Sequence, residues 1–417
     1  MKLSPLQQYG IVTANYWAFT LTDGALRMLV VFHFHQLGFT TLEIAALFLF
    51  YEFFGVVTNL YGGWIGARYG LRLTLWMGTL LQILSLLMLI PVAAGWPKLL
   101  SVVYVMVAQA ISGIAKDLNK MSAKSAIKTV VPETPDDAQQ GQKQLFQWVA
   151  VLTGSKNALK GVGFFLGGVL LATLGFNAAV AWMGAGLALA FLVTLVLPAE
   201  IGKMKRKPGF SALFSKSPGI NRLSLARFFL FGARDVWFVV ALPVFLEASL
   251  GWSFWEIGGF LGLWVIGYGI VQGSAPALRR LWGKTSTPGV SAVQFWSALL
   301  TAIPALIAVA LWREVDVSIA ITAGLAAFGV VFAFNSSIHS YMVLAYTDQE
   351  SVSLNVGFYY MANAAGRLVG TLLSGAVFML GGTNASGMQA CVWSSCLLLV
   401  LSWLSSLRLP PITTGAV

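Results

Sequence analysis

The chain has 417 residues, of which 58% are hydrophobic and only 10% are charged, and its formal net charge is +11 at pH 7. A soluble domain has about 25% charged residues, so this composition, with a mean hydropathy of +0.79, excludes an ordinary soluble protein. Most of the positive charge lies at the ends of apolar segments, where membrane topology accounts for it, so we expect no nucleic-acid partner. The composition predicts an all-α protein that is embedded in a lipid bilayer.

Apolar stretches of about twenty residues recur along the chain, and this is the length that a helix needs to cross the hydrocarbon core. We predict twelve transmembrane helices, at roughly 9–35, 42–65, 73–94, 99–121, 145–173, 177–198, 222–248, 254–278, 289–312, 317–341, 352–380 and 388–407. The first span is full-length and contains Asp23 and Arg27, so we expect no cleavable signal peptide.

Basic residues gather in alternate loops between these helices. The loops assigned to the cytoplasm contain Lys2, Arg68, Arg72, Lys128, Lys143, Lys203, Lys205, Arg206, Lys207, Lys216, Arg279, Arg280, Lys284 and Arg408. The loops assigned to the outside contain only Lys98 and Arg313. The positive-inside rule therefore predicts that both termini lie in the cytoplasm.

A basic segment with proline and glycine divides the predicted helices six and six. We expect an N-terminal six-helix bundle over 1–198, a cytoplasmic linker over 199–221 and a C-terminal six-helix bundle over 222–417. At an offset of 213 residues, LGFTTLEIAALFLFY from Leu37 and LGWSFWEIGGFLGLW from Leu250 share Leu, Gly, Glu and Ile. Coincidence between two apolar turns is the alternative, but the repeat occupies the same place in each half, which favours duplication and two pseudo-symmetric bundles.

The loop after the second predicted helix reads GGWIGARYGLRL and resembles the motif G-x-L-x-D-R-x-G-R-R of the major facilitator superfamily. The matching residues are Gly63, Ile65, Arg68, Gly70 and Arg72, while Ala67 stands in place of the family's aspartate. The resemblance implies the twelve-helix fold of that superfamily and a gating role for Arg68 and Arg72. Alternatively, the two arginines only hold the loop on the cytoplasmic side.

Ionisable residues also lie deep within the predicted helices. The basic ones are Arg27, Lys116, Lys120, Lys156, Lys160, Arg227, Arg234 and Arg367, and the acidic ones are Asp23, Glu52, Asp117 and Asp235. Each would cost about 2.5–3.5 kcal/mol or more against lipid, so they must face one another or a wet cavity. Pairing neutralises at most four of the basic groups. Buried lysines could instead lose their protons, but arginines cannot, and the remaining basic groups predict a small-molecule anionic substrate.

The alternative is a purely structural network of ion pairs. In that network Asp23 pairs with Arg27 four residues away, Asp235 with its neighbour Arg234, and Asp117 with Lys120.

Two pairs of basic residues are the first candidates for binding the anion. Lys156 and Lys160 lie one helical turn apart with Asn157 beside them, and together they suit one multiply charged ligand. Arg27 and Arg234 lie on helices that the repeat relates, and guanidinium groups make forked contacts with phosphate-like oxygens.

Four lysines follow one another at four-residue intervals in the sequence SGIAKDLNKMSAKSAIK. Lys116 and Lys120 lie deeper and are placed to receive an anion that enters from the cytoplasm. Lys124 and Lys128 are expected to reach the cytoplasmic surface.

A polar stripe in the eleventh helix consists of Asn355, Tyr359, Asn363 and Arg367. Tyr359, Asn363 and Arg367 are candidates for lining the same cavity, although such a stripe also serves to pack helices together.

The energy source is predicted to be an ion gradient or an exchanging anion. GKTS at 283–286 lacks the first glycine of a phosphate-binding loop, because position 278 is Leu278. Glu52 has no basic neighbour on its own helix and is a candidate proton carrier, as are Asp23 and Asp235. A structural hydrogen bond is the alternative role for Glu52.

Neither enzymatic nor metal chemistry is expected. Cys391 and Cys396 are five residues apart and so lie on different faces of a helix. The sequence also contains no close metal-ligand spacing or nucleophile–base arrangement. We therefore predict no catalytic residues, no metal and no cofactor.

Four longer strings carry a closer resemblance: NYWAFTLTDGALRMLVVFHFHQLG, SGIAKDLNKMSAKSAIK, LTGSKNALKG and FGARDVWFVVALPVFL. Over nearly its whole length the chain resembles the organoarsenical efflux permeases of the ArsJ type. The resemblance implies export of 1-arseno-3-phosphoglycerate, arsenate resistance, a bacterial inner membrane and a functional link to glyceraldehyde-3-phosphate dehydrogenase. An organophosphate:phosphate antiporter or another organic-anion transporter of the superfamily is the alternative, and a membrane-embedded enzyme or sensor is the third possibility.

Overall fold

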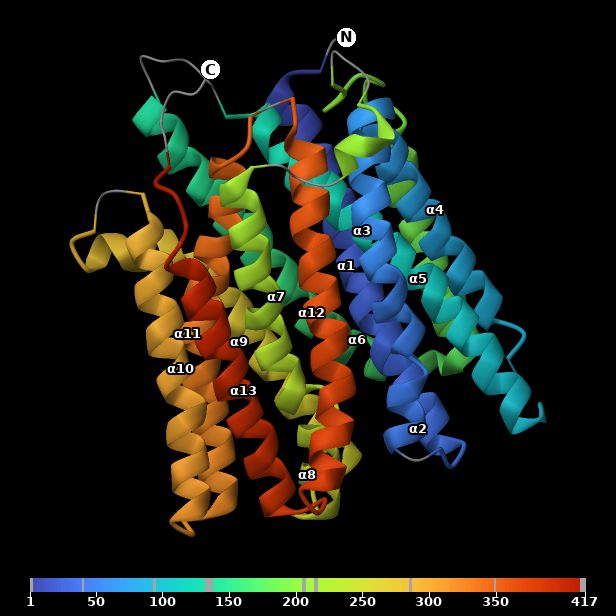
Figure 1. The fold of residues 1–417 in the computed structure, drawn as a ribbon. Helices are drawn as coiled ribbons and strands as arrows, with labels where there is room; N and C mark the ends of the chain where they lie inside the picture. The colour runs from blue at the N-terminus through green and yellow to red at the C-terminus, as the bar shows by residue number, and fades with distance from the viewer. Residues whose placement is uncertain are drawn as a thin grey trace.

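The computed structural model describes residues 3–39, 41–92, 95–131, 138–204, 208–213, 217–284, 287–348 and 350–412. These residues form helices, turns and loops, and they contain no strand (Figure 1). Five basic residues used for the topology prediction lie outside the described residues, namely Lys2, Lys205, Arg206, Lys207 and Lys216.

The first half of the chain forms six long helical segments. Its helices are α1 (Pro5–Gln36), α2 (Thr41–Ala46), α3 (Leu49–Tyr69), α4 (Leu71–Leu89), α5 (Lys98–Ala126) and α6 (Ala138–Thr194). Within α6 the backbone leaves helical geometry at Gly175, where φ is 73° and ψ is 174°. Glycine adopts this conformation without steric cost, so α6 is two helices joined by a tight turn. They correspond to the fifth and sixth predicted spans.

The second half repeats this arrangement. Its helices are α7 (Pro218–Phe238), α8 (Ala241–Ala248), α9 (Phe254–Leu281), α10 (Val290–Trp312), α11 (Val317–Ala345), α12 (Val352–Leu380) and α13 (Ala385–Ser406). The short helix α8 follows α7, and the two together occupy one predicted span. In the same way, the short helix α2 and the helix α3 together occupy one predicted span.

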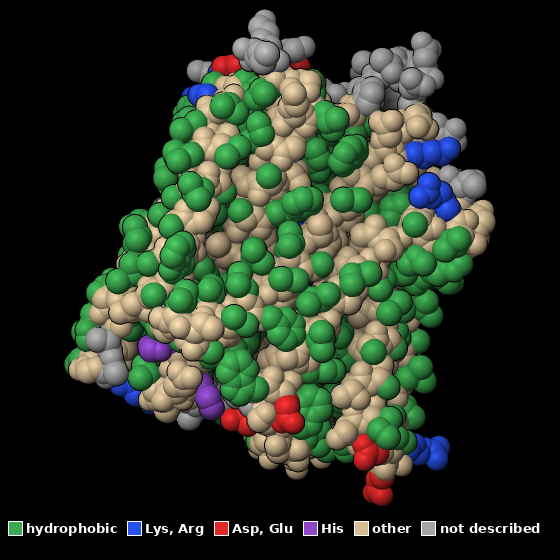
Figure 2. Space-filling view, turned by 180° about the vertical axis from the view of Figure 1, so that it is seen from behind, with side chains coloured by type: hydrophobic (Ala, Val, Ile, Leu, Met, Phe, Trp, Pro, Cys, Tyr) green, Lys and Arg blue, Asp and Glu red, His purple; other side chains and the backbone are tan. Residues whose placement is uncertain are grey.

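The number of spans agrees with the prediction of twelve. Among the described residues, nine helices are long and apolar enough to cross a membrane, with α6 counted once. The helices α1 and α3 are not among the nine, because ionised, aromatic and glycine residues lower their mean hydropathy. With these two helices and the second part of α6, the total is twelve. On the face drawn in Figure 2, apolar side chains cover the middle and charged ones lie toward the two ends.

Glycines with a left-handed backbone confirm the internal pseudo-symmetry. Gly38 and Gly251 have φ values of 82° and 68°, and each lies between the first and second helices of its half. Gly70 and Gly283 have φ values of 95° and 71°, and each lies between the second and third helices. Both pairs are 213 residues apart, which is the offset of the sequence repeat. The chain therefore reverses in the same way at equivalent places, and the fold is two pseudo-symmetric six-helix bundles. The exact boundaries of the halves, including the linker at 199–221, stay a prediction.

Glycines also set the distance between the helices that carry the ionised residues. A Cβ on Gly163 of α6 would lie 2.5 Å from the carbonyl oxygen of Leu21 on α1. A Cβ on Gly370 of α12 would lie 2.5 Å from the carbonyl oxygen of Gly232 on α7. Contacts between small residues let backbones approach closely in lipid, where no hydrophobic effect pulls helices together. In both halves, a glycine in contact with a backbone carbonyl thus lets the two helices approach closely, α6 against α1 and α12 against α7.

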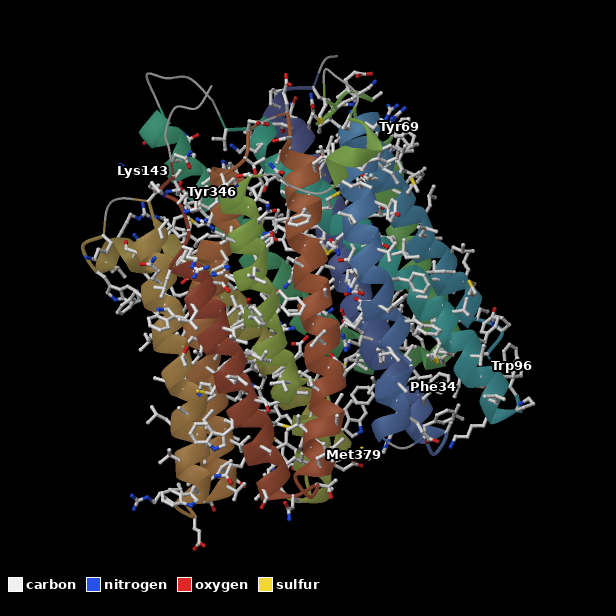
Figure 3. All side chains as sticks on the ribbon, viewed as in Figure 1. Phe34, Tyr69, Trp96, Lys143, Tyr346 and Met379 are labelled. Carbon is white, nitrogen blue, oxygen red and sulfur yellow. The ribbon has the colours of Figure 1, made fainter. Side chains whose placement is uncertain are left out.

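Among the described residues, the buried apolar cluster that contains side chains of both bundles lies toward one side of the molecule. On the side where α1 begins and α13 ends, here called the terminus side, Tyr9, Phe146, Tyr341 and Tyr360 belong to one cluster drawn from both halves. Figure 3 places Tyr69, Lys143 and Tyr346 toward this side and Phe34, Trp96 and Met379 toward the opposite one, the far side. The clusters nearer the far side each belong to a single half. The space between the bundles is therefore closed toward the terminus side.

Backbone contact between α3 and α12 completes this closure. A Cβ on Gly357 would lie 2.6 Å from the carbonyl oxygen of Asn59 and 2.8 Å from the Cα of Gly63. At this crossing the halves touch through bare main chain.

We predict that Gly167→Val destabilises the protein by about 1–3 kcal/mol, which is typical of an overpacked contact. A Cβ at this position of α6 would lie 2.2 Å from the carbonyl oxygen of Ala25, so α1 and α6 must separate. Thermal unfolding of the purified protein measures the effect. Gly186→Val, on the second of the two helices of α6, is the control, because a Cβ there meets nothing within 4 Å. Equal unfolding temperatures for the two variants would contradict the proposed packing role.

Candidate anion-binding site

A cavity of about 300 Å³ lies between the two bundles, and both of them line it. Nine basic residues contribute to its lining: Arg27, Lys116, Lys120, Lys124, Lys156, Lys160, Arg227, Arg234 and Arg367. Among the described residues, Asp23 is the single acidic residue in the lining. Asn157 and Asn363 also line the cavity, so the structure brings together nine of the ten residues predicted to bind substrate. The cavity is positively charged and has the size of a small-molecule site.

Asp23 forms the acid–base pair of the first half. Its Oδ2 accepts a hydrogen bond of 3.0 Å from Lys160 Nζ, and its Oδ1 accepts one of 2.6 Å from the Tyr51 hydroxyl. The structural alternative predicted that Asp23 pairs with Arg27, and this prediction is wrong. The guanidinium of Arg27 instead lies over the ring of Phe48, 4.8 Å from its centroid. The spacing of four residues along α1 did not decide the partner, because α6 brings an amine closer to the carboxylate.

Tyr51 is a site residue that the sequence analysis missed. Lys116 Nζ lies 3.7 Å from the centroid of its ring, Lys160 Nζ lies 5.9 Å away and Arg27 Cζ lies 6.0 Å away. An aromatic face attracts cations, so the ring helps to hold three positive groups at one place. Its one sequence signal was its position beside Glu52.

Arg367 joins the second half to the first. Its Nε donates to Asp235 Oδ2 at 3.0 Å, and its Nη2 donates to Glu52 Oε1 at 2.6 Å. Glu52 also lies 3.6 Å from Lys116 Nζ. Glu52 therefore has two basic partners from other helices, which its own helix did not reveal. Asp235 additionally accepts a 2.5 Å hydrogen bond from its neighbour Arg234, as expected.

The two acid–base pairs within the halves are related by the pseudo-symmetry. Lys160 on α6 pairs with Asp23 on α1, and Arg367 on α12 pairs with Asp235 on α7. Lys160 and Arg367 are 207 residues apart, as are the glycine turns at Gly175 and Gly382 that end their helices. Each half thus ties its fifth helix to its first with one charge pair.

The expected pair between Asp117 and Lys120 is present, and Asp117 also lies 3.8 Å from Lys116 Nζ. Four carboxylates in total are in contact with five of the cavity cations. The other four have no carboxylate within 4 Å among the described residues, and these are Arg27, Lys124, Lys156 and Arg227.

A chain of hydrogen bonds connects two of these four cations across the halves. Lys156 Nζ donates to Asn157 Oδ1 at 3.0 Å, and Asn157 Nδ2 donates to Gln272 Oε1 of α9 at 2.5 Å. Gln272 Nε2 then donates to Ser336 Oγ at 3.3 Å, and Arg227 Nη1 donates to the same oxygen at 3.1 Å. This chain contains no carboxylate, so it orients the two cations without neutralising them.

Two lysines expected at the membrane surface are buried instead. Lys124 is 3% exposed and donates to Thr153 Oγ1, and Lys128 is 6% exposed. The expectation that they extend to the surface is wrong, because α5 continues to Ala126 within the bundle rather than ending at the membrane boundary.

The remaining predicted residues lie outside the cavity lining. Tyr359 is fully buried behind it, with its ring centroid 5.3 Å from Arg227 Cζ. In the last turn of α3, Arg68 Nη1 is 3.5 Å from the Pro208 carbonyl oxygen, and in the first turn of α4, Arg72 Nη1 is 2.8 Å from that of Leu197. Both arginines therefore attach the junction of α3 and α4 to the segment after α6, and their gating role stays a prediction.

We predict that Arg367→Met destabilises the protein by about 3–5 kcal/mol, because it leaves the carboxylates of Glu52 and Asp235 buried with fewer cations. Adding Glu52→Gln to Arg367→Met should recover part of that loss, since one unpaired charge is removed. Denaturant unfolding of the wild type, both single variants and the double variant completes a thermodynamic cycle. Strictly additive effects would contradict a direct ion pair between the two halves.

Comparison with known proteins identifies the fold. The chain is similar in structure to the human organic anion transporter MFSD10 (TETRAN), with a TM-score of 0.73 and 16% identity over 97% of this chain and 100% of that one. It is also similar to a bacterial homologue of the iron transporter ferroportin in an outward-facing state with soaked iron, with a TM-score of 0.69 and 15% identity over 96% and 98%. The proton:xylose symporter XylE gives a TM-score of 0.73 and 14% identity over 99% and 97%.

Sequence comparison gives the family. No curated protein sequence matches the chain. The model of the Major Facilitator Superfamily matches residues 12–293, which is more than half of the chain. The chain is a multi-pass membrane protein with a transporter fold, and it belongs to the Major Facilitator Superfamily.

Proposed function

We propose that this protein is a secondary transporter that exports 1-arseno-3-phosphoglycerate from the cytoplasm of a bacterium and so confers arsenate resistance. The observation that carries the proposal is the charge of the cavity, with nine basic residues and one acidic residue among its described lining. Four of those cations have no carboxylate partner, so an anion must supply the missing negative charge.

The chemistry of the cations supports a phosphate-like ligand. Arg27, Arg227 and Arg234 present guanidinium groups to the cavity, and a guanidinium matches the geometry of two oxygens on phosphate or arsenate. A phosphate monoester carries about −1.5 to −2 charge at pH 7, so a ligand with a phosphate at one end and an arsenate at the other matches several cations. A cationic substrate would be repelled from the same cavity.

The likeness to arsenical permeases rests on residues that surround the cavity. Each of the four strings that carry it contributes lining residues: Asp23 and Arg27 from the first, Lys116 and Lys120 from the second, Lys156 and Lys160 from the third, and Arg234 from the fourth. A resemblance confined to lipid-facing helix surfaces would say little about substrate. This one covers the place where a substrate would bind.

We propose that the protein lies in the inner membrane with both termini in the cytoplasm, and that glyceraldehyde-3-phosphate dehydrogenase supplies its substrate. In this orientation the cavity is closed toward the cytoplasm. Asp23, Glu52 and Asp235 remain our candidates for proton coupling, since each contacts a cation that an arriving anion would compete for.

We predict that everted membrane vesicles containing the protein accumulate arsenic when they are supplied with arsenate, the dehydrogenase and its substrates. Vesicles without the protein, and vesicles supplied with arsenate alone, are the controls. Absence of accumulation would reject the proposal. Exchange of an organophosphate for phosphate without any effect of arsenate would instead favour an organophosphate:phosphate antiporter, which the same basic cavity fits. Substrate turnover by the protein in detergent, without compartments, would favour a membrane-embedded enzyme.

We also predict that Arg27→Ala, Lys156→Ala and Arg234→Ala each abolish arsenate resistance, because each removes a cation from the cavity lining. Growth on arsenate measures the effect, and immunoblotting of membranes checks that each variant reaches the membrane. Arg313→Ala, at the exposed far-side end of α10, is the control and should leave resistance intact. Unchanged resistance in all three cavity variants would remove this site assignment.

A further inference from the structure

The terminus-side end of the cavity contains two basic residues that take part in none of the ion pairs described above. Lys124 comes from α5 in the first half and Arg227 from α7 in the second, and each is only 3% exposed. Neither has a carboxylate within 4 Å among the residues that the structure describes. Burying a cation without a counter-charge costs several kcal/mol, so this end of the cavity lacks a negative group.

Donor groups around this end are also left without acceptors. Arg227 donates through Nη1 to Ser336, but its Nε has no hydrogen-bond partner. Asn363 is 7% exposed and lines the cavity, and its Nδ2 has no partner either. Buried polar groups are nearly always hydrogen-bonded, and each exception calls for an explanation such as strain, a catalytic role, an ordered water or a bound ion. Unsatisfied donors next to unneutralised cations specify an acceptor that is negatively charged.

Neighbouring side chains hold this end in a fixed geometry. The guanidinium of Arg227 lies between aromatic rings, 4.0 Å from the centroid of Phe231 and 5.3 Å from that of Tyr359. Ser336 ties Arg227 to Gln272, and Thr153 accepts a hydrogen bond from Lys124. The donors are therefore positioned before any ligand arrives, which reduces the entropy that binding costs.

This group of donors lies at a different depth from the other cavity cations. Arg227 and Arg234 are seven residues apart on α7, and Lys116 and Lys124 are eight apart on α5, so each pair is separated by about 10–12 Å along its helix. Arg234 and Lys116 lie at the far-side level, near Arg367 and Tyr51 respectively, whereas Lys124 and Arg227 form the terminus-side level. The cavity thus has positive charge at both levels.

We propose that Lys124, Arg227 and Asn363 form an oxyanion subsite at the terminus-side end of the cavity, and that the transporter selects ligands with two separate oxyanion end groups. One end group binds at this subsite and the other at the level of Arg27 and Arg234. The inference rests on the proposed function in taking the cavity as the transport site, and it deepens that function by naming the substrate class as a short-chain bis-oxyanion.

The test compares two stable probes that differ in one end group. Binding of 1,3-propanediphosphonate and of propylphosphonate to the full-length protein in lipid nanodiscs is measured by titration calorimetry. The wild type should bind the diphosphonate at least about tenfold more tightly, since a charge-assisted hydrogen bond is worth about one power of ten in affinity. Arg227→Gln and Lys124→Gln should each bring the ratio of the two Kd values close to one. Arg222→Gln is the matched control on α7, because Arg222 is exposed and donates to the Arg408 carbonyl outside the cavity.

The outcomes separate this inference from the proposed function. A wild-type ratio near one, or a ratio that neither variant changes, overturns the subsite. If one variant does not fold, as judged by its thermal unfolding, the other variant decides. If vesicles accumulate arsenic but the variants leave the ratio of the two Kd values unchanged, the subsite is rejected and the proposed export of the arsenical is retained. A ratio that falls in the variants, without arsenic accumulation by the wild type, retains the subsite and rejects the arsenical as substrate.

Discussion

The structure depends on an imbalance of fixed charge at membrane depth. Ionised side chains are expensive in hydrocarbon, so they are retained there only when they face each other or a polar cavity. In this protein the four deep carboxylates are all engaged by cations, and cations remain after those contacts are counted. The carboxylates join neighbouring helices, and the remaining cations give the space between them its positive charge. One electrostatic requirement thus accounts for both the ion pairs and the charge of the cavity.

The ion pairs have two separate tasks. Lys160 with Asp23 and Arg367 with Asp235 lie inside the halves, where close glycine contacts already hold the same helices together. They can persist while the halves move as rigid bodies. The contact between Arg367 and Glu52 differs, because it crosses from α12 to α3 and must break when those helices separate. Arg367 therefore belongs to both kinds of contact, and it joins the cavity lining to the boundary between the bundles.

Much of this arrangement follows from the sequence, and the part that does not has a common cause. Hydropathy gives twelve helices, the repeat gives two related halves, and the depth of the charges identifies the charged residues of the cavity lining except Lys124. Partners on other helices escape such reasoning: Asp23 meets Lys160 rather than Arg27, and Glu52 meets Arg367 and Lys116. Periodicity describes one helix at a time, whereas these contacts depend on how two helices cross. For the same reason Tyr51 and Gln272 were missed, since an uncharged residue in an apolar run gives no signal until its neighbours are known.

The crossing of α3 and α12 has a consequence for how the molecule tolerates change. At Gly63 and Gly357 the two halves meet main chain to main chain, with no room for a methyl group. Such a junction has no interlocking side chains, so the two halves can separate there without any side chain changing its rotamer. It also cannot adapt, because backbone atoms have no alternative rotamers. Substitution at either glycine should thus be as harmful as loss of a charged residue in the cavity, although neither glycine lines the cavity.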